Sequence, residues 1–460
     1  MKTTRSMFQK LVTRHSSFVT AAFAAFAANA ADISDVIVRQ QWPWSTDVKV
    51  EYKVTGVTTP VDVSVTAFNG ARQLDATNLA SAMTGDRFGI SESGAYSFTI
   101  DPVKAFGTDR IALGDFRVRL SLSASATNIN EVIYKVFDLS TGACTDLSRA
   151  DFYNGKVESG DFVTNFADIG SGFTTSLDDV FIWTGVTNNI KYKTTHLVMR
   201  KIPAANVTWT MGAPASERWK SDKDQIADGS ETNHLVRLTS DYYASVFEVT
   251  QKQYFLVKNA NYANAAEQER EEADILPETG MNPGQAKQFA SAFSTRSGES
   301  FALLTDAQWE FACRAGTTTA LYSGFNVNPA AFWSGGDSHV NEIAWYSANS
   351  GTQTHAVGCK APNAFGLYDM LGNVNEWTQD YYCNGATYVA TFGAGWQPGD
   401  VVVDPQGLQT SESVEYTSRG GRYNHTALYH RSAVRQKGIK EWVTGVGYSG
   451  LRVGMAVSGN

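Results

Sequence analysis

The sequence predicts an α+β protein rich in β-strands and loops, and three observations support this prediction. Aromatic residues make up 12% of the 460 residues and charged residues only 18%, a balance typical of strand-rich proteins with large cores. Apolar and polar residues alternate over much of the N-terminal part. In the C-terminal part, helical spacing is confined to the segments 282–298 and 305–316, and long Gly-, Asn- and Trp-containing stretches follow them.

The length and the net charge of the chain indicate how many domains it has and which partners it lacks. At about 150 residues per domain, 460 residues suggest two or three domains. The net charge is −8, from 46 acidic against 38 basic residues, and no long Lys/Arg run follows the N-terminal segment. We therefore expect no nucleic-acid partner. No later segment has the apolar length of a transmembrane helix, so we also expect no membrane span.

The segment 1–30 has the pattern of a secretory signal peptide. Basic residues precede an apolar run at 18–28, and Ala28-Asn29-Ala30 has the small-x-small form that signal peptidase recognises. About a dozen apolar residues is well short of the ~20 that span a bilayer, which argues against a membrane anchor. The sequence predicts cleavage after Ala30 and export of the mature protein to a periplasm or to the extracellular space.

The segment 31–138 is predicted to be an antiparallel β-sandwich of the immunoglobulin-like type. Apolar and polar residues alternate at 48–54, 61–65 and 116–122. A period of two indicates half-buried strands, and the Gly, Asn, Pro and Asp residues between them indicate turns. The next segment, 139–195, is rich in Gly, Asp, Ser and Thr and is predicted to be an irregular connection.

The region 196–460 is predicted to begin with two helices and to continue mainly as turns. The segment 282–298 starts with an Asn-Pro cap and ends with glycine, and its apolar residues share one face. The segment 305–316 starts with a Thr/Gln capping box and has Gly316 where a left-handed C-cap belongs. Cys313 lies on the inward stripe of this helix, so we interpret it as a small core residue rather than a nucleophile.

The chain has four cysteines, which are too few for a scaffold held together by disulfides. They are Cys144, Cys313, Cys359 and Cys383. Export would permit disulfides, and Cys359 with Cys383 is the pair that we expect.

The region 196–460 carries an ordered set of short motifs. In chain order they are Thr210-Met211-Gly212, FEVTQ at 247–251, TDAQWEFACRAG at 305–316, PNAFGLYDMLGNVNEW at 362–377, Arg419-Gly420-Gly421, RSAVR at 431–435 and Gly450-Leu451-Arg452. Together they resemble the formylglycine-generating enzyme family, also called the sulfatase-modifying factor domain. The resemblance implies a C-type-lectin-like fold with little regular secondary structure and with bound calcium, following the N-terminal sandwich.

The resemblance implies a calcium site between residues 369 and 376. Its ligands would be the side chains of Asp369 and Glu376 and the backbone carbonyls of Gly372 and Val374. Calcium prefers carboxylate and carbonyl oxygens from a tightly turning chain, and the Gly-Asn step permits such a turn. By spacing alone, a solvated acidic turn is the simpler interpretation.

The resemblance also shows that this sequence lacks the copper-binding cysteines of the family. Formylglycine-generating enzymes hold Cu(I) with two active-site cysteines, because soft thiolates suit that metal. Those cysteines would lie between Arg419-Gly420-Gly421 and 431–435, yet the interval 422–430 has no cysteine and is shorter than in the oxidases. Relatives without the copper pair include sulfoxide synthases that hold iron through histidines of an added helical domain, which this chain lacks. The sequence therefore argues against copper and iron.

A candidate cleft is predicted around the terminal motifs. It comprises Tyr423, His425, His430 and Arg435. Two histidines without a nearby carboxylate or thiol are more often polar lining than metal ligands. The motif arginines have two interpretations: they grip carboxylate or sulfate oxygens of a ligand, or they bind loop carbonyls of the fold itself.

Two functions from different classes follow. The first is an exported, calcium-stabilised binding or structural module without formylglycine-generating oxidase activity, whose ligand is a protein, a peptide or a glycan. The alternative is a metal-dependent oxidoreductase that acts on an exported protein, as in sulfatase maturation, or on a small molecule. Fold alone does not choose between them.

Overall fold

The structure is a computed structural model with two compact units. It describes residues 31–41, 45–74, 79, 82–106, 113, 115–124, 129–170, 172–177, 180–214, 217, 230–258, 274–328, 336–408, 415–439 and 448–457. Unit 1 comprises Met1–Glu131 with Ser148–Glu158, and unit 2 comprises Val132–Leu147 with Ser159–Asn460. The predicted signal peptide, 1–30, and its cleavage site lie outside the described residues.

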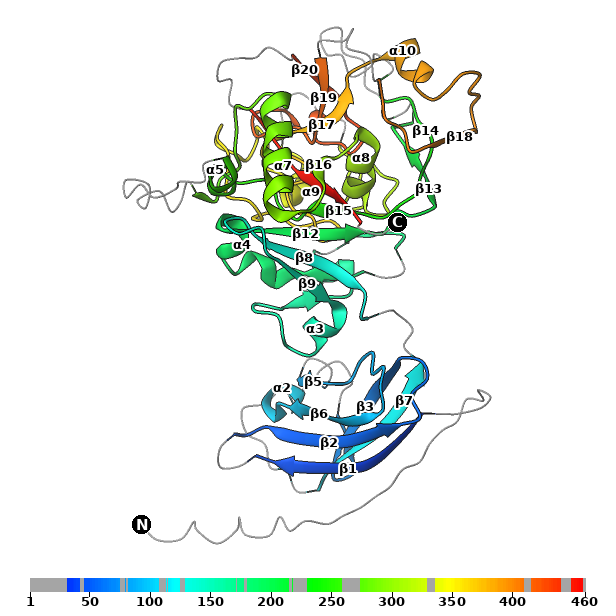
Figure 1. Ribbon diagram of the computed structural model, residues 1–460, viewed down its shortest axis with the longest axis vertical. Helices are drawn as coiled ribbons and strands as arrows, with labels where there is room; N and C mark the ends of the chain where they lie inside the picture. The colour runs from blue at the N-terminus through cyan, green and yellow to red at the C-terminus, as the bar shows by residue number, and fades with distance from the viewer. Residues whose placement is uncertain are drawn as a thin grey trace. The chain divides into compact units, whose positions relative to one another are not determined.

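Unit 1 is built from two antiparallel sheets (Figure 1). The first has the order β1 (Asp32–Gln40), β2 (Val48–Thr55), β6 (Gly94–Ile100), β5 (Met83–Gly85), and the second has the order β4 (Arg72–Gln73), β3 (Val61–Asn69), β7 (Phe116–Ala124). Two short helices, α2 (Pro102–Phe106) and α3 (Arg149–Tyr153), complete the described part. Both sheets contribute to one hydrophobic cluster, which includes Val50, Val63 and Phe98.

The predicted alternation in unit 1 is confirmed at the level of strands. The apolar residues of β2 are buried and its charged residues are not, and β3 pairs with β7 along its whole length. The immunoglobulin-like topology remains a prediction.

The predicted boundary at residue 138 is wrong, because β8 (Val132–Asp138) belongs to unit 2. It pairs antiparallel with β12 (His196–Ile202), and its Tyr134 and Phe137 are buried there. The segment 139–195 is less irregular than predicted. It contains β9 (Cys144–Ser148), α3, the two-stranded sheet β10 (Phe162–Val163) and β11 (Ile182–Trp183), the 3-10 helices η1 (Phe166–Asp168) and η2 (Thr184–Thr187), and α4 (Lys191–Thr194).

Unit 2 contains three larger sheets (Figure 1). The six-stranded sheet has the order β16 (Phe301–Leu303), β22 (Val453–Ala456), β15 (Tyr242–Ser245), β12, β8, β9. The others are β13 (Val207–Met211), β14 (His234–Leu238), β18 (Val401–Val403), and β20 (Gln436–Ile439), β19 (Glu415–Arg419), β17 (Asn375–Tyr381), β21 (Ser449–Gly450). Hydrophobic clusters cover both faces of the six-stranded sheet, since Tyr243 belongs to one cluster and its neighbours Tyr242 and Ala244 to another.

The two predicted helices of unit 2 are confirmed, with their caps. Asn282 caps α7 (Pro283–Ser297) in a capping box, and Gly298 ends it in the left-handed region. Thr305 caps α8 (Asp306–Arg314), whose C-cap is Ala315 at φ 43°, one residue before the predicted Gly316. Other helices in the described part of unit 2 are α5 (Gln251–Lys258), α9 (Ser338–Ile343), α10 (Gly385–Ala390) and the 3-10 helix η6 (Ala427–Tyr429).

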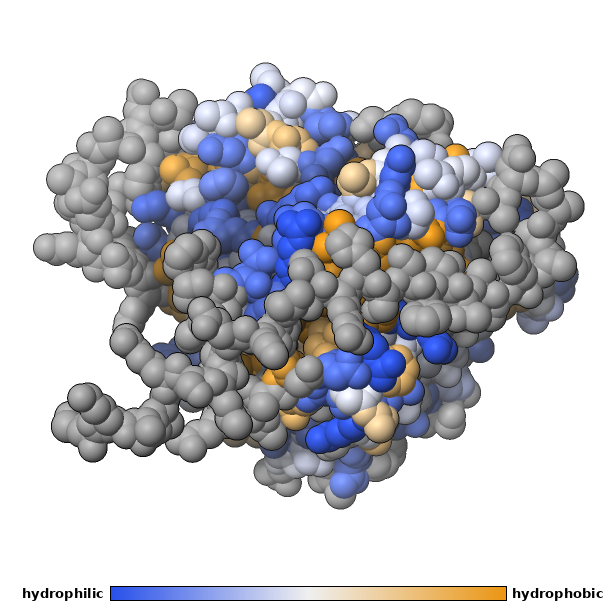
Figure 2. All heavy atoms as spheres, turned by 90° about the horizontal axis from the view of Figure 1, so that it is seen from below, coloured by the Kyte–Doolittle hydropathy of each residue, from blue (hydrophilic) through white to orange (hydrophobic). Residues whose placement is uncertain are grey.

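All four cysteines are free thiols, so the expected Cys359–Cys383 disulfide is wrong. Cys313 is fully buried in the cluster around α8, as predicted for a core residue. Among the residues that the structure describes, no helix combines the length and apolar character needed to cross a bilayer. Among the side chains that Figure 2 shows in colour, hydrophilic ones predominate, with smaller apolar areas between them.

Candidate functional site

The motif residues meet in a buried ionic network around Asp306, the first residue of α8. Arg435 donates from Nε to Oδ2 of Asp306 at 2.7 Å, and Arg419 donates from Nε to Oδ1. Burial opposes ionisation of Asp306, but the two guanidinium groups outweigh it and lower its pKa. The 305–316, Arg419-Gly420-Gly421 and 431–435 motifs are therefore linked through one carboxylate.

The opening motif is held by the same helix. Glu310 Oε1 accepts from the backbone N–H of Gly212 at 2.8 Å and from Arg314 Nε at 2.9 Å. Arg314 in turn donates to the Gly212 carbonyl at 2.8 Å. The second oxygen of Glu310 lies 3.1 Å from a terminal nitrogen of Arg419, which joins this contact to the Asp306 network.

A second buried pair joins the 362–377 and 450–452 motifs. Arg452 binds both oxygens of Glu376, at 2.9 and 3.1 Å from Nε, and Trp309 donates from Nε1 to Oε2 at 2.5 Å. Arg452 also donates to the carbonyls of Ser245 and Tyr368, each at 2.7 Å. Of the two interpretations of the motif arginines, the one in which they bind the fold itself is confirmed for Arg419, Arg435 and Arg452.

The predicted calcium ligands lie beside this pair. Asp369 is buried with φ 55°, and its Oδ2 accepts from the backbone N–H of Gly358 at 2.6 Å. Burial raises the pKa of Asp369 to about 6. Burial and the charges of Asp369 and Glu376 also raise the pKa of Glu248 well above its usual range. Three buried carboxylates thus lie near the guanidinium of Arg452, and the ammonium group of Lys193 acts on Asp369 as well. A bound cation would add positive charge to this cluster.

Two backbone carbonyls at this turn are also available to bind a cation. The carbonyls of Gly372 and Val374 accept no hydrogen bond from another described residue. Both oxygens of Glu376, in contrast, already accept hydrogen bonds from Arg452 and Trp309. Within the described ranges, no group of three or more His, Cys, Asp or Glu side chains could hold a metal ion. Asp369 and the two carbonyls therefore fit calcium better than Glu376 does.

The predicted cleft is only partly brought together. His425 is half-buried, with Nδ1 at 3.1 Å from Gln436 Nε2, and His430 is fully buried, with Nδ1 at 2.9 Å from the Thr426 carbonyl. Burial lowers the pKa of His425 to about 2 and that of His430 to about 4, so both imidazoles are neutral at physiological pH.

Arg435 and His430 do not line a surface cleft, which corrects the prediction for these two residues. Arg435 is buried and directed to Asp306, and it also donates to the Cys383 carbonyl at 2.9 Å. A buried guanidinium needs a counter-charge, and Asp306 supplies it from the interior. Tyr423 remains half-buried at the surface, where its N–H donates to the Asn373 carbonyl at 2.9 Å.

The structure places further aromatic and basic side chains on segments that adjoin Tyr423 through Asn373, which sequence reasoning did not group. We call this set the aromatic–cationic face: Trp345, His355, Lys360, Arg422, Tyr423 and Tyr448, all half-buried. Asn373 links its segments, because its carbonyl accepts from Tyr423 and its Oδ1 accepts from the His355 N–H at 2.9 Å. No sequence signal groups them, because they come from three segments far apart in the chain.

Ring contacts organise this face. The rings of Trp345 and His355 stack with their centroids 3.8 Å apart, and Lys360 Nζ lies 4.0 Å from the centroid of a Trp345 ring. Arg422 Cζ lies 4.3 Å from the Tyr448 centroid, and Tyr448 contacts Tyr423 at 5.9 Å. Aromatic residues with adjacent cations are typical of protein-binding surfaces.

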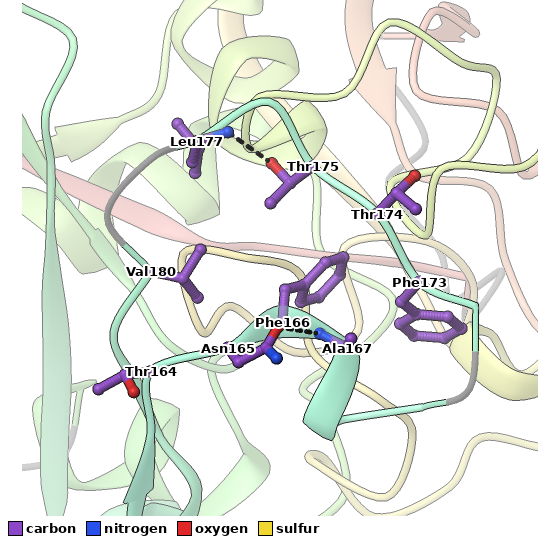
Figure 3. A pocket seen from close by; sticks show the side chains of 9 residues that line it. All are labelled: Thr164, Asn165, Phe166, Ala167, Phe173, Thr174, Thr175, Leu177 and Val180. Atoms are coloured by element: carbon purple, nitrogen blue, oxygen red, sulfur yellow. Dashed lines mark hydrogen bonds between the residues drawn. The ribbon is translucent and has the colours of Figure 1, made fainter.

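A separate cavity of about 320 Å³ lies beside η1. In Figure 3 the segment 164–167 faces the segment 173–177 and Val180 across it. Its lining is neutral: Thr164, Asn165, Phe166, Ala167, Phe173, Thr174, Thr175, Leu177 and Val180. Thr175 is already committed, since its hydroxyl donates to the Ala315 carbonyl at 2.8 Å. The cavity could admit a small neutral molecule. No residue that lines it carries a charge or an activated nucleophile.

Comparisons with known proteins match the C-terminal region. Residues 198–454 match the model of the sulfatase-modifying factor enzyme 1-like domain. The chain is 26% identical over 228 residues to the chaperone protein LppX of Paenibacillus barcinonensis, covering 39% of this chain and 75% of that relative. It is 37% identical over 83 residues to the formylglycine-generating enzyme of Mycobacterium tuberculosis, covering 16% of this chain and only 26% of the enzyme.

A solved structure is also similar. Treponema denticola variable protein 1 aligns with a TM-score of 0.42 and 24% sequence identity, covering 57% of this chain and 96% of that one.

Proposed function

This chain belongs to the sulfatase-modifying factor enzyme 1-like domain family, and we propose that it is an exported, calcium-stabilised binding protein without formylglycine-generating oxidase activity. One observation carries the proposal. The interval 422–430, where the oxidases would carry their copper-binding thiols, has no cysteine. The arginines around it bind the fold rather than a substrate.

The cysteines that the chain does have are poorly suited to replace that pair. Burial raises the pKa of Cys313 to about 12 and also raises that of Cys383. Burial has the same effect on Cys144, to about 12, and on Cys359. Copper(I) binds thiolates, so four thiols with raised pKa values favour a protein without a copper centre.

An arginine that follows this interval also binds another part of the fold. Arg431 binds both oxygens of Glu231, at 2.9 and 3.0 Å, and donates to the Leu428 carbonyl at 3.1 Å. Each nitrogen of the Arg431 guanidinium group thus donates to a group of the protein itself. A bidentate buried pair of this kind holds the loop in one conformation.

The aromatic–cationic face is the surface that we assign to ligand binding. Trp345 is half-buried, and its Nε1 is enclosed without a hydrogen-bond partner among the described residues, so its ring rather than its N–H would contact a ligand. Lys360 and Arg422 add positive charge beside the rings. The relative LppX is named a chaperone protein. Together these points favour an exported polypeptide as the ligand, although a glycan could stack on the same rings.

Calcium would act at the turn formed by Asp369, Gly372 and Val374. The carboxylate of Asp369 and the two carbonyls would hold the ion, with Glu376 as a further ligand only where its contacts with Arg452 and Trp309 permit. When bound, calcium supplies positive charge to a buried acidic cluster and so stiffens the turn. Asn373, which lies within this turn, binds both Tyr423 and His355, so the ion would also steady the aromatic–cationic face.

The test is incubation of the full mature chain, with and without added copper, with a peptide that carries the sulfatase Cys-x-Pro-x-Arg motif. We expect the peptide cysteine to remain unchanged, with no aldehyde trapped by a hydrazide reagent. Conversion of the cysteine to an aldehyde would overturn the proposal. A genuine formylglycine-generating enzyme run in parallel controls for the peptide and the reagent.

The alternative function, a metal-dependent oxidoreductase, has two observations in its favour. The formylglycine-generating enzyme relative is an enzyme by name, and the neutral imidazoles of His425 and His430 are close enough to interact electrostatically. Such imidazoles can ligate a transition metal. Retention of iron or copper by the purified chain, and its loss in a His425→Ala variant, would support this alternative.

For unit 1 we propose an immunoglobulin-like sandwich. Its two antiparallel sheets around one shared core favour this architecture. We further propose that the segment 1–30 directs export. Edman sequencing of protein secreted by a suitable host would test this, with Ala31 expected at the mature N-terminus.

A further inference from the structure

Arg87 of unit 1 is buried, and the described residues provide it with no counter-charge. Only 6% of the residue is exposed, and its carbonyl accepts from the Val63 N–H at 2.6 Å, which ties it to β3. No carboxylate among the described residues forms an ion pair with its guanidinium. The buried arginines Arg431 and Arg452 of unit 2, in contrast, each bind a buried glutamate.

Aromatic rings surround the guanidinium of Arg87. Its Cζ lies 4.7 Å from the centroid of the Phe88 ring and 5.9 Å from that of Phe98. Phe88 contacts Tyr153 of α3 at 4.5 Å, and Phe98 contacts Tyr52 at 6.0 Å. We call this group the Arg87 cage. Burial lowers the pKa of Arg87 to about 10, opposed by the two tyrosines, so the side chain remains a cation at neutral pH.

The rings attract the cation but do not neutralise it. A cation–π contact is weak compared with the cost of removing a full charge from water, and an unpaired buried charge is among the most destabilising arrangements in proteins. The Nε atom is enclosed and has no hydrogen-bond partner. The two terminal nitrogens form no hydrogen bond with a described residue either, yet they are not fully enclosed, so the guanidinium end is open to a ligand.

We propose that the Arg87 cage is an anion-binding site that takes a monoanionic carboxylate with an apolar body. The planar guanidinium matches a carboxylate in a bidentate pair. One cation balances one negative charge, so a phosphate with a second charge would be poorly compensated. The half-buried ring of Phe88 would contact the apolar body of the ligand, whereas Phe98, which is 1% exposed, stays in the core. A free aliphatic or aromatic acid and the carboxylate of a polypeptide share this chemistry.

The test is calorimetric titration of the full mature chain with benzoate, with an amidated and a free-acid form of one short apolar peptide, and with inorganic phosphate. We expect benzoate to bind with one site per chain and to bind more tightly than phosphate. The free-acid peptide binding at least as well as benzoate, and better than its amide, would identify a polypeptide terminus as the source of the carboxylate. Benzoate binding alone would identify a free acid.

Three variants make the assignment specific. Arg87→Met removes the charge at similar volume and is expected to weaken benzoate binding at least about tenfold. Arg87→Lys keeps the charge without the planar fork and should give an intermediate loss. Arg119→Met, at an exposed arginine of β7, is the matched control and should bind like the parent chain.

Thermal unfolding adds a readout that does not depend on affinity. Without benzoate, Arg87→Met should unfold at the same Tm as the parent chain or higher, because it removes an unpaired buried charge. With benzoate in large excess, the parent Tm should rise by about 5 °C or more and that of Arg87→Met should not. Equal benzoate binding by Arg87→Met, tighter binding of phosphate, or a lower Tm of Arg87→Met without ligand would each overturn the proposal.

Discussion

Arg435 and Asp306 lie 129 residues apart in the chain and are joined inside unit 2 by a hydrogen bond of 2.7 Å from Nε to Oδ2. Arg419 binds the other oxygen of the same carboxylate. Two family motifs thus converge on the first residue of α8. The arginine that the sequence suggested for a ligand pocket is instead part of the interior.

Replacing Arg435 should therefore cost stability. Arg435→Met would leave Asp306 with one guanidinium instead of two, and breaking a buried pair in this way costs about 3–5 kcal/mol in the free energy of unfolding. Urea unfolding followed by circular dichroism measures this. Arg237→Met, at an exposed arginine of β14, is the control and should change stability by no more than about 0.5 kcal/mol. A folded Arg435→Met of unchanged stability would show that Arg435 is free to face a ligand.

The thiols should react slowly and in a fixed order. Cys144 and Cys359 are exposed, whereas Cys313 and Cys383 are buried. Burial raises the pKa of Cys313 and Cys383, and partial desolvation raises that of Cys144 and Cys359. At pH 7.5 iodoacetamide should label the two exposed cysteines more slowly than free cysteine, and the buried two only after unfolding. Mass spectrometry of tryptic peptides resolves the four sites. Rapid labelling of Cys313 or Cys383 in the folded chain would show an accessible, reactive thiol, as a catalytic role requires.

Asp380 should make stability depend on pH. Its Oδ2 accepts from the Asp306 N–H at 2.5 Å, and burial together with the charge of Asp306 raises its pKa to about 8. In the unfolded chain it titrates near pH 4. Between about pH 4 and pH 8 the unfolded chain releases a proton that the native state retains, so this contribution to stability is lost as pH rises across that window.

Asp380→Asn should remove this dependence, because the amide resembles the protonated acid. Relative to the parent chain, it should gain free energy of unfolding as pH increases, on the order of a few kcal/mol by pH 8. Urea titrations at pH 5, 6.5 and 8 measure the trend. The absence of a trend, in which Asp380→Asn differs from the parent by the same amount at pH 5 and at pH 8, would mean that Asp380 is ionised in the native state throughout this range.

Calcium should raise the Tm of unit 2 through Asp369. At a calcium concentration of a hundred times the dissociation constant, the expected stabilisation is about 2.7 kcal/mol. Asp369→Asn keeps the shape of the side chain but loses the charge, so its Tm should respond little to calcium. Asp168→Asn, at an exposed aspartate, is the control and should respond fully. A full calcium response in Asp369→Asn would remove this residue from the site.

Local features were predictable from the sequence. The capping boxes at Asn282 and Thr305 and the alternation in β2 depend on residues a few positions apart, and all three are confirmed. The domain boundary was not predictable, because the sequence of β8 indicates a strand but not the sheet to which that strand belongs. What places it in unit 2 is pairing with β12, which begins nearly sixty residues further along the chain.

The candidate site was less predictable for the same physical reason. The sequence drew attention to Arg435 and His430 but contained no signal for their partners. Whether an arginine faces a ligand or the core depends on which carboxylate the fold brings to it, and Asp306 became visible as that carboxylate only in three dimensions. The aromatic–cationic face likewise depends on Asn373, which joins segments that the chain keeps apart.

The measurement that tests the central claim most directly is the metal content of the mature chain, purified without chelator or affinity-tag metal. We expect calcium in near-stoichiometric amount and neither copper nor iron, as a binding protein without oxidase chemistry requires. Stoichiometric copper or iron would contradict the account, and would direct attention to His425 and His430 as the ligands of a catalytic centre.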